Sequence, residues 1–297
     1  MPGLPEVTRA ASFGINDIDH VVAAVDDADR AGESFARMGF TVTPLSMLHN
    51  VGVANRLVLL QPPSPGAANF FEVMSPLHQH PVAPGLHPHL VGTSGYRWIV
   101  LSGADAVRTH RDLVRDGYSF APPVAVKRDW QLSDSEVLHV AFDVLLPTDA
   151  PLPFNFCAYH TLEHYLRPEW LSHPNGARSM TDILCMVDQP EPFLSYFERL
   201  FNATRRRRLR GIDAVTPGGV ALLVGDQASW HASIGCVARP QSTGACEVLG
   251  CRIVVDSLRE TRAWLRDAGF AGEDCELGLR VESPLQDRTS LFFYEIN

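Results

Sequence analysis

Several features that would assign a function directly are missing from this sequence of 297 residues. No uninterrupted apolar run approaches the roughly 18 residues that a membrane-spanning helix needs, so we expect no membrane partner. None of the six cysteines forms a CxxC pair, which argues against a zinc ribbon. No glycine-rich nucleotide loop and no GxSxG nucleophile elbow occur, so neither a nucleotide site nor a serine hydrolase is indicated.

An excess of basic residues is also missing. The 25 Lys and Arg residues face 34 Asp and Glu residues, and the net charge of -9 argues against a nucleic-acid partner. The start of the chain lacks a basic segment followed by an apolar one, so we expect no secretory signal. The expected compartment is the cytoplasm, where thiols stay reduced. Hydrophobic residues at 45% and charged residues at 20% are typical of a globular protein.

Histidine is present in an uneven distribution. Of the 12 histidines, 11 lie at or before His173, and only His231 follows. Four of them fall within His78–His89, where proline and glycine alternate with histidine, as in a solvent-exposed connector. The remaining early histidines are therefore the ones to place on secondary structure.

The chain begins with one strand, one helix and three further strands. β-branched residues predict a first strand over 15–25, and the acidic start of 26–38 followed by Gly39 predicts a helix with a glycine stop. Strands over 40–44, 55–61 and 70–74 follow. The same order recurs with starts near residues 15, 95, 181 and 250, and three of the helices share an ending of glycine and an aromatic residue.

The later rounds complete the pattern. Their expected helices cover 105–117, 191–201 and 258–268, and their expected strands cover 96–102, 137–146, 153–157, 182–187, 220–224, 233–238, 251–255 and 291–296. The loop-forming run His173–Met180 separates the second round from the third. We therefore predict two domains, over 1–177 and 178–297.

The repeated βαβββ unit resembles the vicinal oxygen chelate superfamily, and the first half resembles its glyoxalase-like domain. The matching segments are DHVV at 19–22, GFTVTP at 39–44, His49, NRL at 55–57, FE at 71–72, FC at 156–157, Thr161 with Glu163, RPEW at 167–170 and HPNGA at 173–177. The resemblance implies an α+β fold in which four units form two half-open barrels. It also implies a divalent metal in a barrel, without specifying a reaction.

Two residues of the first half are candidate metal ligands. His20 and Glu72 each lie within a strand among apolar neighbours, where an ionised carboxylate is costly unless it is paired or bound to a metal. The resemblance places their two strands side by side and gives ligands to these two positions. The alternative is an ordinary buried hydrogen-bonded pair.

A third ligand is expected near the end of the strand at 153–157. His160 is the first candidate, followed by Glu163 and His164, while a Cys157 thiolate would favour zinc. Two histidines and one carboxylate suit non-haem Fe(II) and also fit Mn(II), Zn(II) or Ni(II) as a Lewis acid. Glu163 as a fourth group would favour glyoxalase-like proton transfer.

Three further residues are candidates for contact with the substrate. His49 is either a catalytic base or a solvated loop residue, and Asn55 and Arg56 could orient a carboxylate or carbonyl group. His164 is a further candidate for substrate binding. The arginine run 205–208 is expected to be a solvated strand start or a salt-bridged surface, ahead of a site for a phosphate or an acidic partner, and His173 a structural turn residue.

The second half has no histidine in the two strands that would carry ligands. Glu295 in FFYEI matches Glu72 in FFEVM, yet a lone carboxylate makes a weak site. We therefore expect one working site, in the first half, with the second half as support or as the interface of a homo-oligomer. The expected function is a metal-dependent enzyme that chelates a small substrate through neighbouring oxygens, with Fe(II) dioxygenase chemistry ahead of a lyase or isomerase using Zn, Ni or Mn. The third alternative is a non-catalytic binding or resistance protein.

Overall fold

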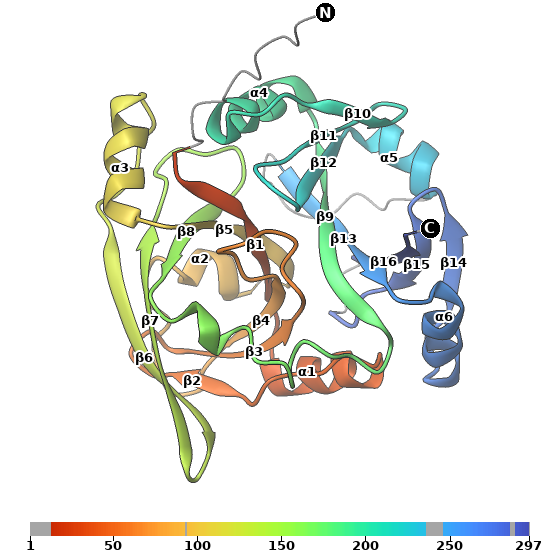
Figure 1. Cartoon of the computed structure of the whole chain (residues 1–297), viewed down its shortest axis with the longest axis horizontal. Helices are drawn as coiled ribbons and strands as arrows, with labels where there is room; N and C mark the ends of the chain where they lie inside the picture. Colours follow the sequence, from red (N-terminus) through yellow and green to blue (C-terminus); the bar gives the residue numbers. More distant parts are fainter. Residues whose placement is uncertain (1–12, 93, 236–245, 286–288, 297) are drawn as a thin grey trace, which may run out of the picture.

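The computed structural model describes residues 13–92, 94–235, 246–285 and 289–296. Two eight-stranded sheets, each curled into a half-open barrel, lie next to each other (Figure 1). Each sheet combines two βαβββ units, so the predicted α+β architecture of four units in two barrels is confirmed. No helix of the described residues has the length and apolar character needed to cross a membrane.

The first sheet contains the strands of the first two units in the order β2-β3-β4-β1-β5-β8-β7-β6. Strands β1 and β5, the first strands of their units, pair antiparallel at its centre. The strands are β1 Ile15–Ala24, β2 Ser46–Leu48, β3 Val53–Leu59, β4 Phe70–Pro76, β5 Gly95–Gly103, β6 Val124–Ser133, β7 Glu136–Leu145 and β8 Phe154–Tyr159. The helices are α1 Ala28–Arg37, α2 His87–Leu90, α3 Ala106–Arg115 and the short 3-10 helix Leu162–His164.

The second sheet repeats this arrangement in the order β10-β11-β12-β9-β13-β16-β15-β14. Its strands are β9 Ala177–Val187, β10 Arg206–Leu209, β11 Ile212–Val215, β12 Ala221–Gly225, β13 Cys246–Val255, β14 Gly272–Cys275, β15 Gly278–Glu282 and β16 Ser290–Glu295. Its helices are α4 Pro190–Phe201, α5 Gln227–Ile234 and α6 Leu258–Asp267.

Short polar side chains set the helix starts in three of the four units. Asp27, Asp105 and Ser257 precede α1, α3 and α6, and each accepts a hydrogen bond from a backbone N–H of the first turn. The predicted glycine stop after α1 is Gly39, which adopts a left-handed backbone with a φ of +86°. These caps fix the residue at which each helix begins after the strand that precedes it.

Side chains alternate between the two faces of each sheet, because successive residues of a strand point to opposite sides. On β1, Val21 and Ala23 pack outward while Val22 and Ala24 pack into the barrel. The outward residues of both sheets, together with α1, α3, α4 and α6, form one hydrophobic cluster that runs from Ile15 to Phe293. The inside of the first barrel is filled by two separate clusters that contain Trp98 and Trp130, respectively.

Buried polar contacts also join the two barrels. Asp17 on β1 accepts hydrogen bonds from the backbone N–H groups of Gly219 (2.8 Å) and Val220 (3.0 Å), which precede β12. Asn69 exchanges two hydrogen bonds with the backbone of Met180 on β9. The barrels are thus connected by specific backbone contacts in addition to the shared core.

Two expected strands differ from the structure, and several observed strands, β6, β10, β11, β14 and β15 among them, were not predicted. Residues 40–44 form no strand, and the short strand β2 follows at Ser46–Leu48. Residues 233 and 234 end the helix α5, while the rest of the expected strand at 233–238 lies almost entirely outside the described residues. Strand β6 was not predicted, because its mixed sequence VAVKRDWQLS has charged residues between its apolar ones.

The arginine run 205–208 lies at a salt-bridged surface, as expected. Arg205 binds the carboxylates of Glu191 and Glu198 on α4, and Arg207 binds that of Asp213 on β11. These ion pairs place Arg205 and Arg207 on the surface between α4 and the edge of the second sheet.

Candidate functional site

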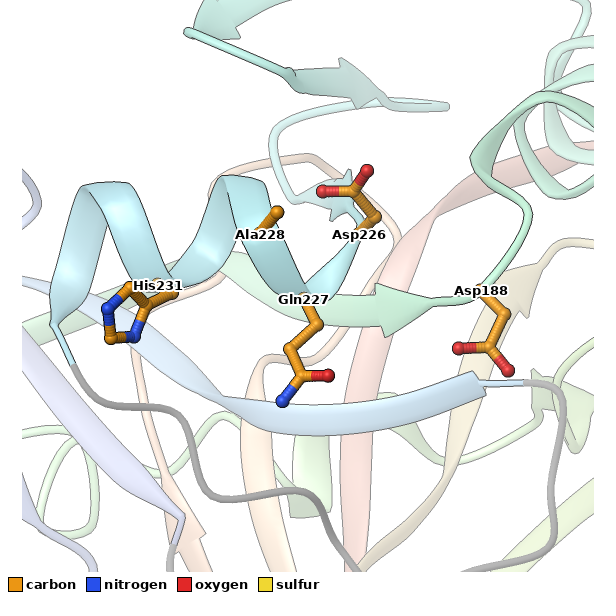
Figure 2. A pocket seen from close by; sticks show the side chains of 5 residues that line it. All are labelled: Asp188, Asp226, Gln227, Ala228 and His231. Carbon is orange, nitrogen blue, oxygen red and sulfur yellow. The ribbon is translucent and has the colours of Figure 1, made fainter.

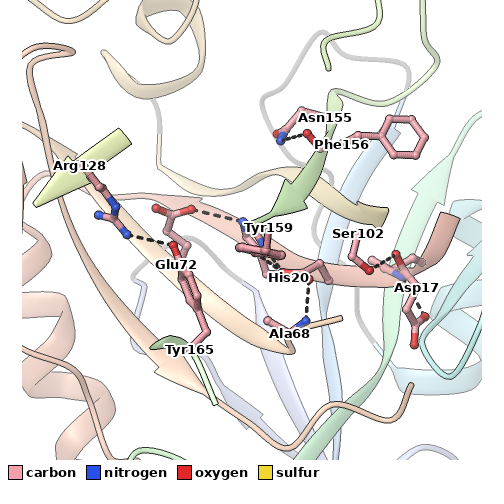
Figure 3. A network of polar contacts seen from close by, with 12 residues as sticks. Asp17, His20, Ala68, Glu72, Ser102, Arg128, Asn155, Phe156, Tyr159 and Tyr165 are labelled. Atoms are coloured by element: carbon pink, nitrogen blue, oxygen red, sulfur yellow. Dashed lines mark hydrogen bonds and ion pairs between the residues drawn. The ribbon is translucent and has the colours of Figure 1, made fainter. Parts of the chain in front are cut away.

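His20 and Glu72 meet inside the first barrel, as the sequence analysis proposed. His20 lies on β1 and Glu72 on the neighbouring β4, where Glu72 pairs with Val22. The Nε2 atom of His20 is 3.4 Å from Oε2 of Glu72, and the exposed fractions of the two side chains are only 7% and 14%. Figure 3 shows the two side chains reaching toward each other across the sheet.

Asp19 orients the imidazole of His20. The Oδ1 atom of Asp19 lies 2.7 Å from Nδ1 of His20, and Asp19 is completely buried. The same carboxylate accepts hydrogen bonds from the hydroxyl of Tyr159 (2.8 Å) and the backbone N–H of Ala68 (2.7 Å). A proton on Nδ1 therefore satisfies Asp19, while Nε2 faces the carboxylate of Glu72 and donates to it when the ring is protonated. Asp19 belongs to the DHVV motif, and its role as the support of His20 was not predicted.

Glu72 is held as a carboxylate by its surroundings. Burial alone would raise the pKa of Glu72, but the hydrogen bond and charge of His20, the charge of Arg128 and the amide of Asn55 lower this pKa below its usual value. Asn55, predicted to contact substrate, donates from Nδ2 to Oε1 of Glu72 over 2.5 Å. Burial would likewise lower the pKa of His20, yet Asp19 and Glu72 raise it above its ordinary value.

Arg128 on β6 adds a positive charge to the barrel interior. It donates to the hydroxyl of Ser46 (2.9 Å) and contacts Oδ1 of Asn55 (3.5 Å) and the hydroxyl of Tyr165 (3.4 Å), as drawn in part in Figure 3. Its guanidinium lies over the ring of Trp130, 5.3 Å from the centroid. Sequence reasoning missed Arg128 because it missed β6, although Val126, Arg128 and Trp130 alternate at the spacing of a strand.

Three other polar side chains inside the barrel stay neutral. Burial raises the pKa of Tyr165 to about 12 and raises the pKa values of Cys157 and Tyr159 well above their usual range. Cys157 is thus a buried thiol, and its predicted alternative role as a thiolate ligand for zinc gains no support from its surroundings.

The two units of the first barrel allow a comparison of equivalent positions. His20 stands seven residues before the helix-capping Asp27, and Trp98 stands seven residues before Asp105. Val22 pairs with Glu72, and the equivalent Val100 pairs with Asn155. The second unit therefore carries an indole and an amide at the positions where the first carries an imidazole and a carboxylate.

His160 does not join His20 and Glu72 in the structure. It follows the end of β8, its side chain is 57% exposed, and its Nε2 contacts Oδ2 of Asp143 at 3.1 Å. The inward residues of β8 are the odd-numbered ones, including Cys157 and Tyr159, so strand alternation directs His160 to the other side. The sequence does not show where this strand ends, so the direction of the His160 side chain could not be predicted from alternation.

The other predicted site residues lie apart from this pair. His49 and Glu163 are exposed, and the ring neighbour of His49 is His80, with centroids 4.9 Å apart. His164 is half-buried in the 3-10 helix after β8. Arg56 points out of the barrel and binds Asp29 on α1, because it alternates with the inward Asn55 on β3.

The fit of a metal ion follows from these positions. Among the residues described, no three His, Cys, Asp or Glu side chains come together as a ligand group. His20 and Glu72 nevertheless have the spacing of two ligands of one ion, because atoms about 2.1 Å from a tetrahedral centre lie about 3.4 Å apart. The hydrogen bond from Asp19 to the second ring nitrogen is the usual support of a metal-bound histidine. The pair fits an ion held by two protein ligands.

The second barrel has different residues at the equivalent positions. Asp182 stands seven residues before Gln189, which precedes α4, and its carboxylate lies 3.5 Å from Nη1 of Arg252. Arg252 in turn pairs with Phe292, which occupies the position of Glu72. The expected match between Glu295 and Glu72 is therefore wrong by three residues, and Glu295 instead accepts a hydrogen bond from the backbone of α6.

A shallow hollow of about 500 Å³ lies on the second half of the molecule. Figure 2 shows its lining of Asp188, Asp226, Gln227, Ala228 and His231. Asp226 caps α5 by accepting a hydrogen bond from the N–H of Ser229 (2.8 Å). The hollow contains none of the predicted site residues.

Comparison with known proteins agrees with this architecture. Residues 18–201 match the family described as the glyoxalase-like domain. No curated protein matches. A hypothetical protein from Staphylococcus aureus is 11% identical with a TM-score of 0.64, over 94% of this chain and 99% of that one.

Two further solved structures share the fold at low identity. The Mn(II)-bound glyoxalase from Novosphingobium aromaticivorans is 9% identical with a TM-score of 0.54, over 95% of this chain and 82% of that one. A xylose isomerase-like TIM barrel/4-hydroxyphenylpyruvate dioxygenase fusion protein is 13% identical with a TM-score of 0.52, over 99% of this chain and 51% of that one. With the family match covering more than half of its length, the chain belongs to the glyoxalase-like domain family.

Proposed function

We propose that the first barrel is the active site of a metal-dependent enzyme that binds a small substrate through two neighbouring oxygens. The observation that carries the proposal is the 3.4 Å separation between Nε2 of His20 and Oε2 of Glu72, with Asp19 on the other ring nitrogen. These two residues would hold the ion, and the Mn(II)-bound glyoxalase of the same fold supports this assignment.

When bound, a divalent ion supplies a Lewis acid that polarises substrate oxygens. The chain's own residues prepare the site. Asp19 fixes the orientation of His20, and the amide of Asn55 holds Oε1 of Glu72 so that Oε2 faces the imidazole. Buried aromatic residues around this pair limit the access of water, which strengthens the electrostatic contacts.

A lyase or isomerase is now favoured over an Fe(II) dioxygenase. The preference for Fe(II) depended on two histidines and one carboxylate, and His160 contacts Asp143 at an exposed position. We therefore propose Mn(II), Zn(II) or Ni(II) chemistry in which a proton is exchanged next to the chelated oxygens. The two predicted bases, His49 and Glu163, are both exposed.

Metal binding is the first test. We expect one Mn(II) per chain by electron paramagnetic resonance, and a large loss of affinity in His20→Ala and Glu72→Gln. His139→Ala is the matched control, because His139 also pairs with an aspartate, Asp129, but is 81% exposed. Unchanged Mn(II) affinity in both site variants would refute the assigned ligands.

The reaction class needs a second measurement. Deuterium exchange from solvent at the carbon beside the oxygens of a 2-hydroxy ketone, followed by NMR on the Mn(II), Zn(II) or Ni(II) protein, is the expected result for a lyase or isomerase. Oxygen consumption with a catechol on the Fe(II) protein would instead favour the dioxygenase.

A non-catalytic binding protein is the second candidate. Trp98 and Asn155 stand at the positions equivalent to His20 and Glu72, which favours a site that binds its ligand without an ion. Absence of metal from the purified protein and after reconstitution with all four ions would support this candidate over the enzyme.

A further inference from the structure

The first barrel contains a guanidinium without a carboxylate partner. Arg128 contacts Ser46, Asn55 and Tyr165, all through neutral groups, and forms no ion pair with any residue that the structure describes. By contrast, Arg56 on the outer face of the same barrel binds the carboxylate of Asp29. The charge of Glu72 acts on the half-buried Arg128 through space, but no carboxylate among the described residues engages the guanidinium fork directly.

Two buried hydrogen-bond donors in this region have no acceptor. The Nε atom of Arg128 and the Nε1 atom of Trp130 are both buried and find no partner among the described residues. Both residues point inward from β6, with the guanidinium over the indole ring. Buried donors without acceptors are rare in proteins, and an excess of donors favours a ligand that supplies acceptor oxygens.

The charges inside the barrel indicate the sign of that ligand. Asp19 and Glu72 contribute two negative charges and Arg128 one positive charge, while His20 is neutral when it binds an ion. A divalent ion bound to His20 and Glu72 would bring the sum of these charges to one net positive charge. A monoanion would restore neutrality in an interior where an unbalanced charge is costly.

We propose that the substrate is a small monoanionic carboxylate whose carboxylate group binds Arg128 while a neighbouring oxygen approaches the His20–Glu72 pair. The inference deepens the proposed function and rests on it, since the charge balance includes the ion. Arg128 is connected to that pair through Asn55, which contacts both Arg128 and Glu72. Arg128 takes the role that the sequence analysis gave to Arg56.

The experiment compares acids with their uncharged amides. Binding of mandelate, mandelamide, lactate and lactamide is measured by calorimetry on the protein with and without Mn(II). We expect the acids to bind more tightly than the amides. Arg128→Met should weaken acid binding by about 10- to 100-fold, as for the loss of a charged hydrogen bond, and should leave the amides unaffected.

Two variants separate charge from folding. Arg128→Lys keeps the charge and should retain part of the preference for acids. Lys127→Met is the matched control, because Lys127 is the exposed neighbour on β6 and should leave every affinity unchanged. Thermal unfolding of each variant shows whether the fold is intact.

The two proposals fail in different ways. Arg128→Met should not weaken Mn(II) binding, because removal of a nearby positive charge cannot disfavour a cation. Absence of Mn(II) binding in the wild type would refute the metal site, and the dependence of acid binding on Arg128 would then be judged on the metal-free protein. Equal affinity for acids and amides, no binding of either acid at millimolar concentration, or an unchanged preference in Arg128→Met would overturn the carboxylate proposal.

Discussion

His173 should make the stability of the protein depend on pH in a defined window. Its ring lies between two backbone groups: Thr41 donates its N–H to Nδ1 over 3.0 Å, and Nε2 lies 2.9 Å from the carbonyl of Leu59. Nδ1 is an acceptor, so the ring must be neutral, with its proton on Nε2. Burial and the charge of Arg178 lower the pKa of His173 to about 4, against the opposing contact with Leu59.

The sign follows from the two pKa values. In the unfolded chain His173 takes up a proton near its usual pKa of about 6.5. In the folded protein the same ring takes up a proton only near its lowered pKa of about 4. The contribution to stability is therefore complete above pH 6.5 and is lost as the pH falls from there toward 4. Between about pH 7.5 and about pH 5 the loss amounts to about 2 kcal/mol of unfolding free energy.

Urea unfolding at these two pH values tests the prediction. His173→Gln keeps a donor that can reach the Leu59 carbonyl but does not titrate, so its loss of stability on acidification should be about 2 kcal/mol smaller than that of the wild type. His139→Gln is the control, because His139 is exposed, and should behave like the wild type. An identical loss in His173→Gln and the wild type would refute the reasoning.

Three further predictions concern the site and its scaffold. Asp19→Asn should lower Mn(II) affinity by about 10- to 100-fold, measured by paramagnetic resonance, and an unchanged affinity would contradict the role of Asp19 in orienting His20. Gly39→Ala should destabilise the protein more than Gly269→Ala in thermal unfolding: both glycines have a φ of +86°, but only at Gly39 would a Cβ meet the Trp264 ring, at 2.5 Å from Nε1. Equal losses of stability in the two variants would show that the Trp264 ring moves aside at no cost in free energy. His160→Ala should leave metal affinity unchanged, and a clear loss would restore His160 as a ligand.

The fold could be predicted because each unit repeats the same local signals. Gly39, Gly117 and Gly269 each follow a helix and adopt positive φ values, so the shared ending of glycine and an aromatic residue reported a real chain reversal. Strand β6 is one of several strands that escaped prediction; it is partly exposed and carries charged residues such as Lys127. It pairs with β7 in a hairpin, where cross-strand contacts rather than its composition stabilise it as a strand.

The candidate site could be predicted only where strand positions were certain. His20 and Glu72 lie well within β1 and β4, and the resemblance to the superfamily gave ligands to these two positions. His160 lies one residue beyond β8, where a shift of one position reverses the direction of a side chain. Arg128 gains its importance from contacts with Ser46, Asn55 and Tyr165, which are distant in the sequence, whereas Asp19 orients the imidazole of its immediate neighbour His20.

The hydrophobic cluster between the sheets determines which residues of the second half can be substituted without affecting the site in the first half. Outward residues of the second sheet, such as Ile183 and Phe293, belong to the same packed layer as Val21 behind His20, so a change of shape there would reach the first site. Its inward residues, among them Leu223 and Phe292, face their own barrel and form a separate cluster. The inside of the second barrel is therefore the place where this chain could acquire a second binding preference while keeping its first.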